Sequence, residues 1–369
     1  MKFIGLFSII LFTGSYLFSQ TEDVFTKVEG QYNTMASEFG ELPKGEKEYF
    51  INAISSHYVY KEESFLIDEN SRFESYLNKV FKTIAPNLNH YPKCRLYKSA
   101  YPNAFTEFLG EMNFHWGILA ELESEASLAF LMGHEYGHYR ESHLYKSYSQ
   151  RDINEDSDRE AVIKHYHDEQ SQEFESDSIG FLLGQKAGYD WEQGLVDFYE
   201  FVSMDTLFSL MESKANIYEA DGEISTSTDE DNDDSLFISH PPTLSRIKKW
   251  KNWGSKVQQY NVKYIVSKKD FLELQNYSKL RTLSHFLKCQ DYKMGLIKAF
   301  KYFALSPDNP DFQYYLYEFI RRKLLQNKGL ADKKFMSDIF VSGNKIGIFN
   351  NLKWVFNQAD QVSFVKNNL

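Results

Sequence analysis

The chain has 369 residues and, with 42% of them hydrophobic, is long enough to build a core in a catalytic domain and in a smaller second domain. A formal net charge of −11 at pH 7 argues against nucleic acid as a partner. Cys94 and Cys289 are the only cysteines, which excludes a disulfide framework; one bridge between them is less favoured than two buried thiols.

Residues 1–20 differ in character from the rest of the chain. Lys2 precedes an almost wholly apolar run from Phe3 to Phe18, and acidic residues begin at Glu22. This pattern is typical of a secretory signal peptide, and an uncleaved anchor is the weaker alternative. Because no later stretch is apolar for long enough to cross a bilayer, we expect an exported protein, periplasmic or secreted, without a transmembrane span once the signal is removed.

The first strong helical pattern follows Asn70 and ends before Pro86. Its apolar residues keep the helical period throughout: Phe73, Tyr76, Leu77, Val80, Phe81 and Ile84. Short strands are predicted next, at about 94–98, 103–105 and 112–118, and in the last of these apolar residues alternate with polar ones. We therefore expect a small antiparallel sheet with a half-buried strand ahead of the next helix.

That next helix is predicted to begin after the N-cap Ser124 and to contain the run from His134 to His138, an HExxH motif. Residues four apart share a helix face, so both imidazoles can approach one metal ion while Glu135 lies beside the ion's open side. The pattern is typical of zinc sites that activate water. The alternative is a chance pair of histidines on an exposed helix.

A catalytic zinc ion normally has three protein ligands and a water, so a third ligand is needed. A helix predicted over about 169–187, with Gly188 as its stop, has Glu173 and Asp177 on one face, whereas Glu175 points elsewhere. We predict Glu173 as the third ligand and Asp177 as the acceptor for the free ring nitrogen of a ligand histidine. A solvated acidic face is the alternative.

Two polar segments interrupt these helices. Residues 146–168 are predicted to be an exposed excursion, and residues 219–234 are acidic with almost nothing to bury, which predicts disorder. A calcium loop is a weaker interpretation of 219–234, because the glycine and the closing glutamate of that pattern are missing. A further hypothesis is that this acidic segment and His240 gate the zinc site.

Beyond Gly254, the predicted domain boundary, the sequence becomes helical and aromatic. The run from Gln290 to Pro310 resembles the second helix and exit turn of a tetratricopeptide repeat, although any antiparallel helix pair gives a similar pattern. We predict a signal peptide over 1–20, a mostly α catalytic domain with a small antiparallel sheet over 21–255, and an all-α, TPR-like domain over 256–369.

Together these motifs resemble peptidase family M48, the gluzincins that include HtpX, the CAAX prenyl proteases and BepA. The soluble, exported members with a C-terminal helical domain are the closest match. The chain departs from the family at Ser176, where alanine is usual, and at 108–110, where Pro-Gly-Gly is usual. The matching pieces occur in the family's order: Asn103-Ala104-Phe105, Gly110, Glu125, the HExxH motif with His143 after it, Glu173 with Asp177, residues 187–190, and His240-Pro241 with Arg246.

The resemblance implies an endopeptidase with one zinc ion per chain, in which Glu135 is the base, His240 or Arg246 stabilises the oxyanion, and His143 is structural. It also implies that the substrate adds as an extended strand near Asn103. The backbone hydrogen bonds of such a strand depend little on the substrate's sequence. We expect broad action on extended or misfolded envelope proteins, with the C-terminal helices as a candidate docking site for them. The alternative is a helical-repeat chaperone or scaffold with a structural, catalytically silent zinc, against which the intact Glu135 argues.

Overall fold

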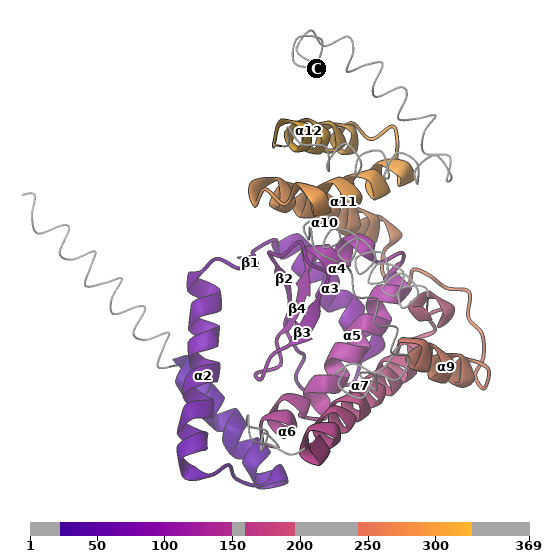
Figure 1. Cartoon of the computed structure of the whole chain (residues 1–369). Coiled ribbons are helices and arrows are strands. Elements are labelled where there is room, and N and C mark those ends of the chain that lie inside the picture. Colours follow the sequence, from indigo (N-terminus) through magenta and orange to yellow (C-terminus); the bar gives the residue numbers. More distant parts are fainter. Residues whose placement is uncertain (1–22, 150–158, 196–242, 327–369) are drawn as a thin grey trace, which may run out of the picture.

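The computed structural model describes residues 23–149, 159–195 and 243–326 (Figure 1). The predicted signal peptide, the acidic segment and His240 lie outside the described residues. After a helix at 23–39, the elements are α2 (Lys44–Glu63), β1 (Ile67–Asp68), α3 (Ser71–Ile84), β2 (Cys94–Tyr97), β3 (Ala104–Thr106), β4 (Met112–His115), α4 (Trp116–Glu121), α5 (Glu125–Arg140), α6 (His143–Ser149), α7 (Arg159–Ala187), α9 (Thr243–Gly254), α10 (Lys268–Lys288), α11 (Tyr292–Leu305) and α12 (Pro310–Gln326).

The strands form one four-stranded sheet in the order β1-β2-β4-β3. β1 and β2 pair antiparallel, as do β3 and β4, but β2 and β4 pair parallel with Cys94 opposite Met112. The sheet is therefore mixed, and the prediction of a purely antiparallel sheet was wrong for its central pair. The chain reverses direction twice between β2 and β4, so these two strands run the same way once β4 lies beside β2.

The third predicted strand proved shorter and more buried than expected. β4 ends at His115, and α4 begins at Trp116, although the apolar alternation continues to Ile118. All four residues of β4 are buried, the polar ones included. The His115 ring stacks on the Tyr97 ring with centroids 4.8 Å apart, and its Nδ1 lies 3.0 Å from the Tyr101 carbonyl oxygen. Neighbouring strands and loops therefore cover the face that the alternation assigned to solvent.

The predicted helix after Asn70 is α3, and all six residues of its apolar stripe are buried. Asn70 caps it by accepting a hydrogen bond from the Phe73 amide. The stripe lies in the main hydrophobic core, together with β2, β4, α5, part of α7 and α9. This core supports the two helices that carry the predicted ligands.

Helix α7 begins at Arg159, about ten residues before its predicted start, so part of the expected polar excursion is helical. Polar residues extend a helix without leaving a periodic apolar signal, which explains the late prediction. The end of the helix was predicted correctly: Ala187 is its last residue, and Gly188 has a φ of +92°, in the left-handed region.

The helices at 23–39 and α2 gave no clear sequence pattern, yet they pack against the catalytic core. They share a hydrophobic cluster with Phe108 and with Tyr145 of α6. Lys61 of α2 is fully buried and donates to the carboxylates of Glu107 and Glu111, at 2.6 Å for the latter. These contacts hold α2 against the loop that joins β3 to β4.

The C-terminal region is helical as predicted, with α10, α11 and α12 layered over one another (Figure 1). They have their own hydrophobic cluster, which includes Ala100 and Ala120 from the catalytic part. Glu121, the last residue of α4, accepts from Lys298 at 2.8 Å, from Lys301 at 2.6 Å and from the Tyr302 hydroxyl at 2.7 Å. A buried ionic cluster therefore joins α11 to α4.

Neither cysteine is paired, and none of the helices within the described ranges is long and apolar enough to cross a membrane. Cys94 is buried in β2, as expected for a thiol in a core. Cys289, which follows α10, is exposed, so the expectation of two buried thiols was wrong for this residue.

Candidate active site

Helices α5 and α7 approach each other closely because small residues face each other across their contact. A Cβ added at Gly133 would lie 2.8 Å from the Cα of Gly180, and a Cβ added at Gly137 would lie 2.8 Å from the Cα of Ser176. The absence of side chains at these positions allows the two backbones to touch. The histidines of α5 can therefore reach the carboxylates of α7.

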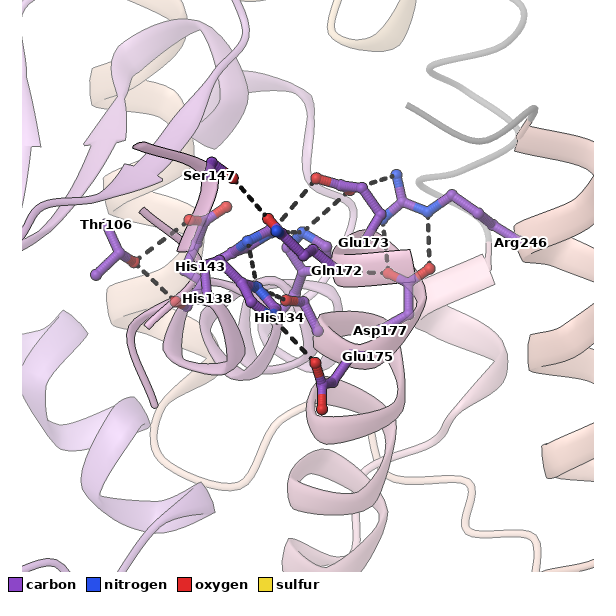
Figure 2. Close-up of polar contacts among 12 residues, drawn as sticks. Thr106, His134, His138, His143, Ser147, Gln172, Glu173, Glu175, Asp177 and Arg246 are labelled. Carbon is purple, nitrogen blue, oxygen red and sulfur yellow. Dashed lines mark hydrogen bonds and ion pairs between the residues drawn. The ribbon is translucent and has the colours of Figure 1, made fainter. Parts of the chain in front are cut away.

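Among the described residues, His134, His138 and Glu173 form the only cluster of such side chains that could hold a metal ion, with candidate ligand atoms within 4.8 Å of one another. The two histidine Nε2 atoms are 3.1 Å apart, and Glu173 oxygens lie 3.7 Å from His134 Nε2 and 3.4 Å from His138 Nε2 (Figure 2). Ligands of a tetrahedral zinc ion are roughly 3.3 to 3.6 Å apart, given metal distances of about 2.0 to 2.2 Å. The three side chains thus fit one zinc ion.

Asp177 lies one turn after Glu173 and contacts His134 from behind. Its Oδ1 is 2.9 Å from His134 Nδ1, which leaves His134 Nε2 directed at the cluster. Arg246 of α9 donates two hydrogen bonds to the same carboxylate, at 2.7 and 2.6 Å, and its guanidinium is 3.4 Å from Glu173. Although burial lowers the pKa of His134, the hydrogen bond and charge of Asp177 outweigh it and raise that pKa. Asp177 therefore orients His134 and increases its basicity.

Glu135 is buried beside the ligand histidines, and this burial raises the pKa of its carboxyl group. Thr106 of β3 donates to the Glu135 backbone carbonyl at 2.8 Å, and the same hydroxyl lies 3.4 Å from Glu135 Oε2. The edge strand and the motif helix are therefore joined at the residue predicted to be the base.

His138 has different partners from His134. Burial, followed by repulsion from His134, lowers the pKa of His138 to about 3, so the ring is neutral at pH 7, the form that binds metal. Its Nδ1 lies 3.1 Å from Nδ1 of His143, and the Nε2 of His143 lies 3.0 Å from Glu175. Glu175 does point away from the ligand cluster, as helical spacing predicted, but toward His143.

A cleft of about 1030 Å³ opens over this cluster. Its walls include Met35 from the helix at 23–39, the segment from Tyr101 to Phe108, and Met294 of α11. Asn103 lines the cleft with an exposed side chain, next to the edge strand β3. The cleft therefore passes the candidate zinc ligands, and its walls include the helix at 23–39 and α11.

Comparison with protein families agrees with this geometry. Residues 69–156 match the model of peptidase family M48. This segment of the chain is therefore similar to family M48. A comparison with curated proteins gave no match. The matched segment contains strands β2, β3 and β4 and the motif helix α5, but β1 precedes it, and it ends before Glu173, Asp177 and Arg246, which the structure brings to the site.

Members of family M48 are zinc-dependent metallopeptidases, so the match supports a metallopeptidase, for which the family implies protein or peptide substrates. Sequence reasoning found the residues that are four apart on one helix. It missed Thr106, the contact between His143 and Glu175, and the glycines that face α7. A signal for these glycines was present, since Gly133 and Gly137 are themselves four apart, the first just before the motif and the second within it.

Proposed function

We propose that this chain is an exported zinc endopeptidase of family M48 that cleaves extended or misfolded proteins of the cell envelope. The observation that carries the catalytic part is the position of Glu135, which is buried beside a three-ligand cluster at the base of an open cleft. A structural zinc site is closed by four protein ligands and needs no such carboxylate. A chaperone or scaffold with silent zinc is therefore the weaker reading.

His134, His138 and Glu173 would hold the zinc ion, which supplies an acidified water and polarises the scissile carbonyl. Glu135 would take a proton from that water and deliver it to the leaving amine. Burial raises the pKa of the Glu135 carboxyl group, and a carboxyl group that holds a proton more readily is better suited to carry it from the water to the amine. Thr106 would keep the carboxylate aligned.

The sheet edge supports an extended substrate. β3 is the outer strand of the sheet and lines the cleft, so a peptide can add to it through backbone hydrogen bonds. Asn103, at the start of this edge, is the proposed side-chain contact. Because backbone hydrogen bonds depend little on the substrate's sequence, the choice of substrate would depend on whether a polypeptide is unfolded. The proposed export and the proposed helical repeat domain rest on the resemblance to exported members of the family.

Arg246 and His240 have different proposed roles in the reaction, and different evidence supports each role. Arg246 is held by two hydrogen bonds to buried Asp177, so we assign it to the support of Asp177 and Glu173 rather than to the oxyanion. The role of His240 in stabilising the oxyanion rests on the family resemblance.

The test is casein digestion by the purified chain, with and without a chelator, combined with metal analysis. Glu135→Gln should reduce cleavage at least about a hundredfold and retain one zinc per chain. Glu173→Ala should lose both zinc and activity. Glu192→Gln, at an exposed position, is the matched control and should behave like the wild type. Full cleavage by the Glu135 variant would refute the mechanism.

A further inference from the structure

The two candidate histidine ligands are supported by different outer groups. Asp177 contacts His134 directly, whereas His138 contacts a second imidazole, that of His143, at 3.1 Å between the two Nδ1 atoms. His143 is buried, and its other nitrogen lies 3.0 Å from an oxygen of Glu175 (Figure 2). His138, His143 and Glu175 therefore form a series of contacts that extends from the cluster to the protein surface, where the Glu175 side chain is 48% exposed.

The proton positions along this chain follow from the atoms involved. His138 directs Nε2 at the other ligands, so a ring that binds metal through that lone pair has its hydrogen on Nδ1. Nδ1–H of His138 then donates to the Nδ1 lone pair of His143. This leaves the hydrogen of His143 on Nε2, from which it donates to the carboxylate of Glu175. Every nitrogen is matched with both rings neutral.

Ser176, which stands where alanine is usual in the family, provides a further contact to His143. Its buried hydroxyl lies 3.3 Å from the same Nδ1 of His143. The residue faces Gly137 across the close contact between α5 and α7, so its backbone position is fixed. His143 is thus held from three sides, by α5, by Ser176 and by Glu175.

We propose that His143 and Glu175 are positioning residues that hold His138 in its metal-binding orientation and tautomer, through a relay of two hydrogen bonds. The proposal rests on the zinc site of the proposed function. Glu175 is the informative member, because its exposed side chain contributes little to the core, so its loss should not unfold the chain.

The experiment measures zinc affinity by competition with a chromophoric chelator, and the visible absorption spectrum of the Co²⁺-substituted protein. Glu175→Ala and His143→Leu remove an acceptor or the whole ring. Glu175→Gln and His143→Gln each retain an oxygen that can accept the same hydrogen bond. Asp168→Ala, a carboxylate about two turns earlier in α7, is the matched control.

We expect zinc affinity to fall about tenfold in Glu175→Ala and about ten- to a hundredfold in His143→Leu, the range for lost outer partners of ligand histidines. Both glutamine variants should recover most of the loss, and Asp168→Ala should bind like the wild type. The Co²⁺ spectrum should change in the two deletion variants at full loading. If His143→Leu does not fold, the Glu175 pair decides.

Zinc affinity of Glu175→Ala within twofold of the wild type, with an unchanged Co²⁺ spectrum, would overturn the relay. An equal loss in Asp168→Ala would also overturn it, because the effect would then be one of charge. Failure of the wild type to bind zinc would instead refute the proposed function, so the two failures are distinguishable.

Discussion

At the scale of single residues, the alignment of Glu135 depends on a hydroxyl from another element. Thr106 contacts both the carbonyl and the carboxylate of Glu135, while the helix itself fixes only the backbone. A buried carboxylate without this contact can adopt other rotamers. The rate of proton transfer should therefore depend on a residue that is not in the HExxH motif.

Thr106→Val tests this dependence, because valine keeps the shape and removes the hydroxyl. We expect kcat to fall roughly three- to tenfold, the equivalent of one net hydrogen bond of about 0.5 to 1.5 kcal/mol. Zinc content should not change. Thr83→Val, in α3, removes a hydroxyl that donates to the Lys79 carbonyl of its own helix and is the control. Wild-type kcat in Thr106→Val would show that the helix alone positions Glu135.

At the scale of elements, the distance between α5 and α7 sets the geometry of the ligand cluster. Gly180 of α7 lies against the backbone of α5. A Cβ added at Gly180 would lie 2.8 Å from the backbone nitrogen of His134 and 2.9 Å from the carbonyl oxygen of Phe130. Neither is the end of a flexible side chain, so the helices themselves would have to separate. His134 and Glu173 would then move apart.

Gly180→Ala should therefore lower both the melting temperature and the affinity for zinc. Overpacking of this kind costs about 1 to 3 kcal/mol, and the loss should appear in thermal unfolding of the metal-free protein. Gly30→Ala is the control, since nothing lies within 4 Å of its added Cβ, and alanine favours a helix. An unaltered zinc affinity in Gly180→Ala would show that the site tolerates a wider helix spacing.

At the scale of the whole molecule, the cleft takes its walls from the helix at 23–39, from the catalytic sheet and from α11. Its shape therefore depends on how the C-terminal helices dock. Glu121 is central to this docking, because it is buried and accepts from Lys298, Lys301 and Tyr302. Although burial raises the pKa of Glu121, the two lysines outweigh it and lower that pKa to about 2.

A carboxyl group whose pKa is lower in the folded than in the unfolded state stabilises the fold above its unfolded pKa, here near 4.5. That contribution is lost as the pH falls from about 4.5 toward about 2. Glu121→Gln should thus cost about 3 kcal/mol at pH 7, measured by urea unfolding, and much less at pH 2. Asp23→Asn, from an exposed ion pair, should cost less than about 1 kcal/mol. An equal cost for Glu121→Gln at both pH values would contradict this assignment.

The sequence by itself determined the features that repeat along a helix or cap its end. The apolar stripe of α3, the cap at Ser124 and the stop at Gly188 were all predicted correctly. The face shared by Glu173 and Asp177 follows the same rule, because residues four apart lie together on any helix. Local spacing fixes such features before tertiary packing contributes.

Only the tertiary structure decided which elements meet. The parallel pairing of β2 with β4, the hydroxyl of Thr106 beside Glu135, and the contact of His143 with Glu175 join residues far apart in the chain. The same holds for Lys61, buried against Glu107 and Glu111. None of these contacts has a local period or a cap to announce it. They arise because polar groups that packing removes from water must find partners wherever the fold brings them together.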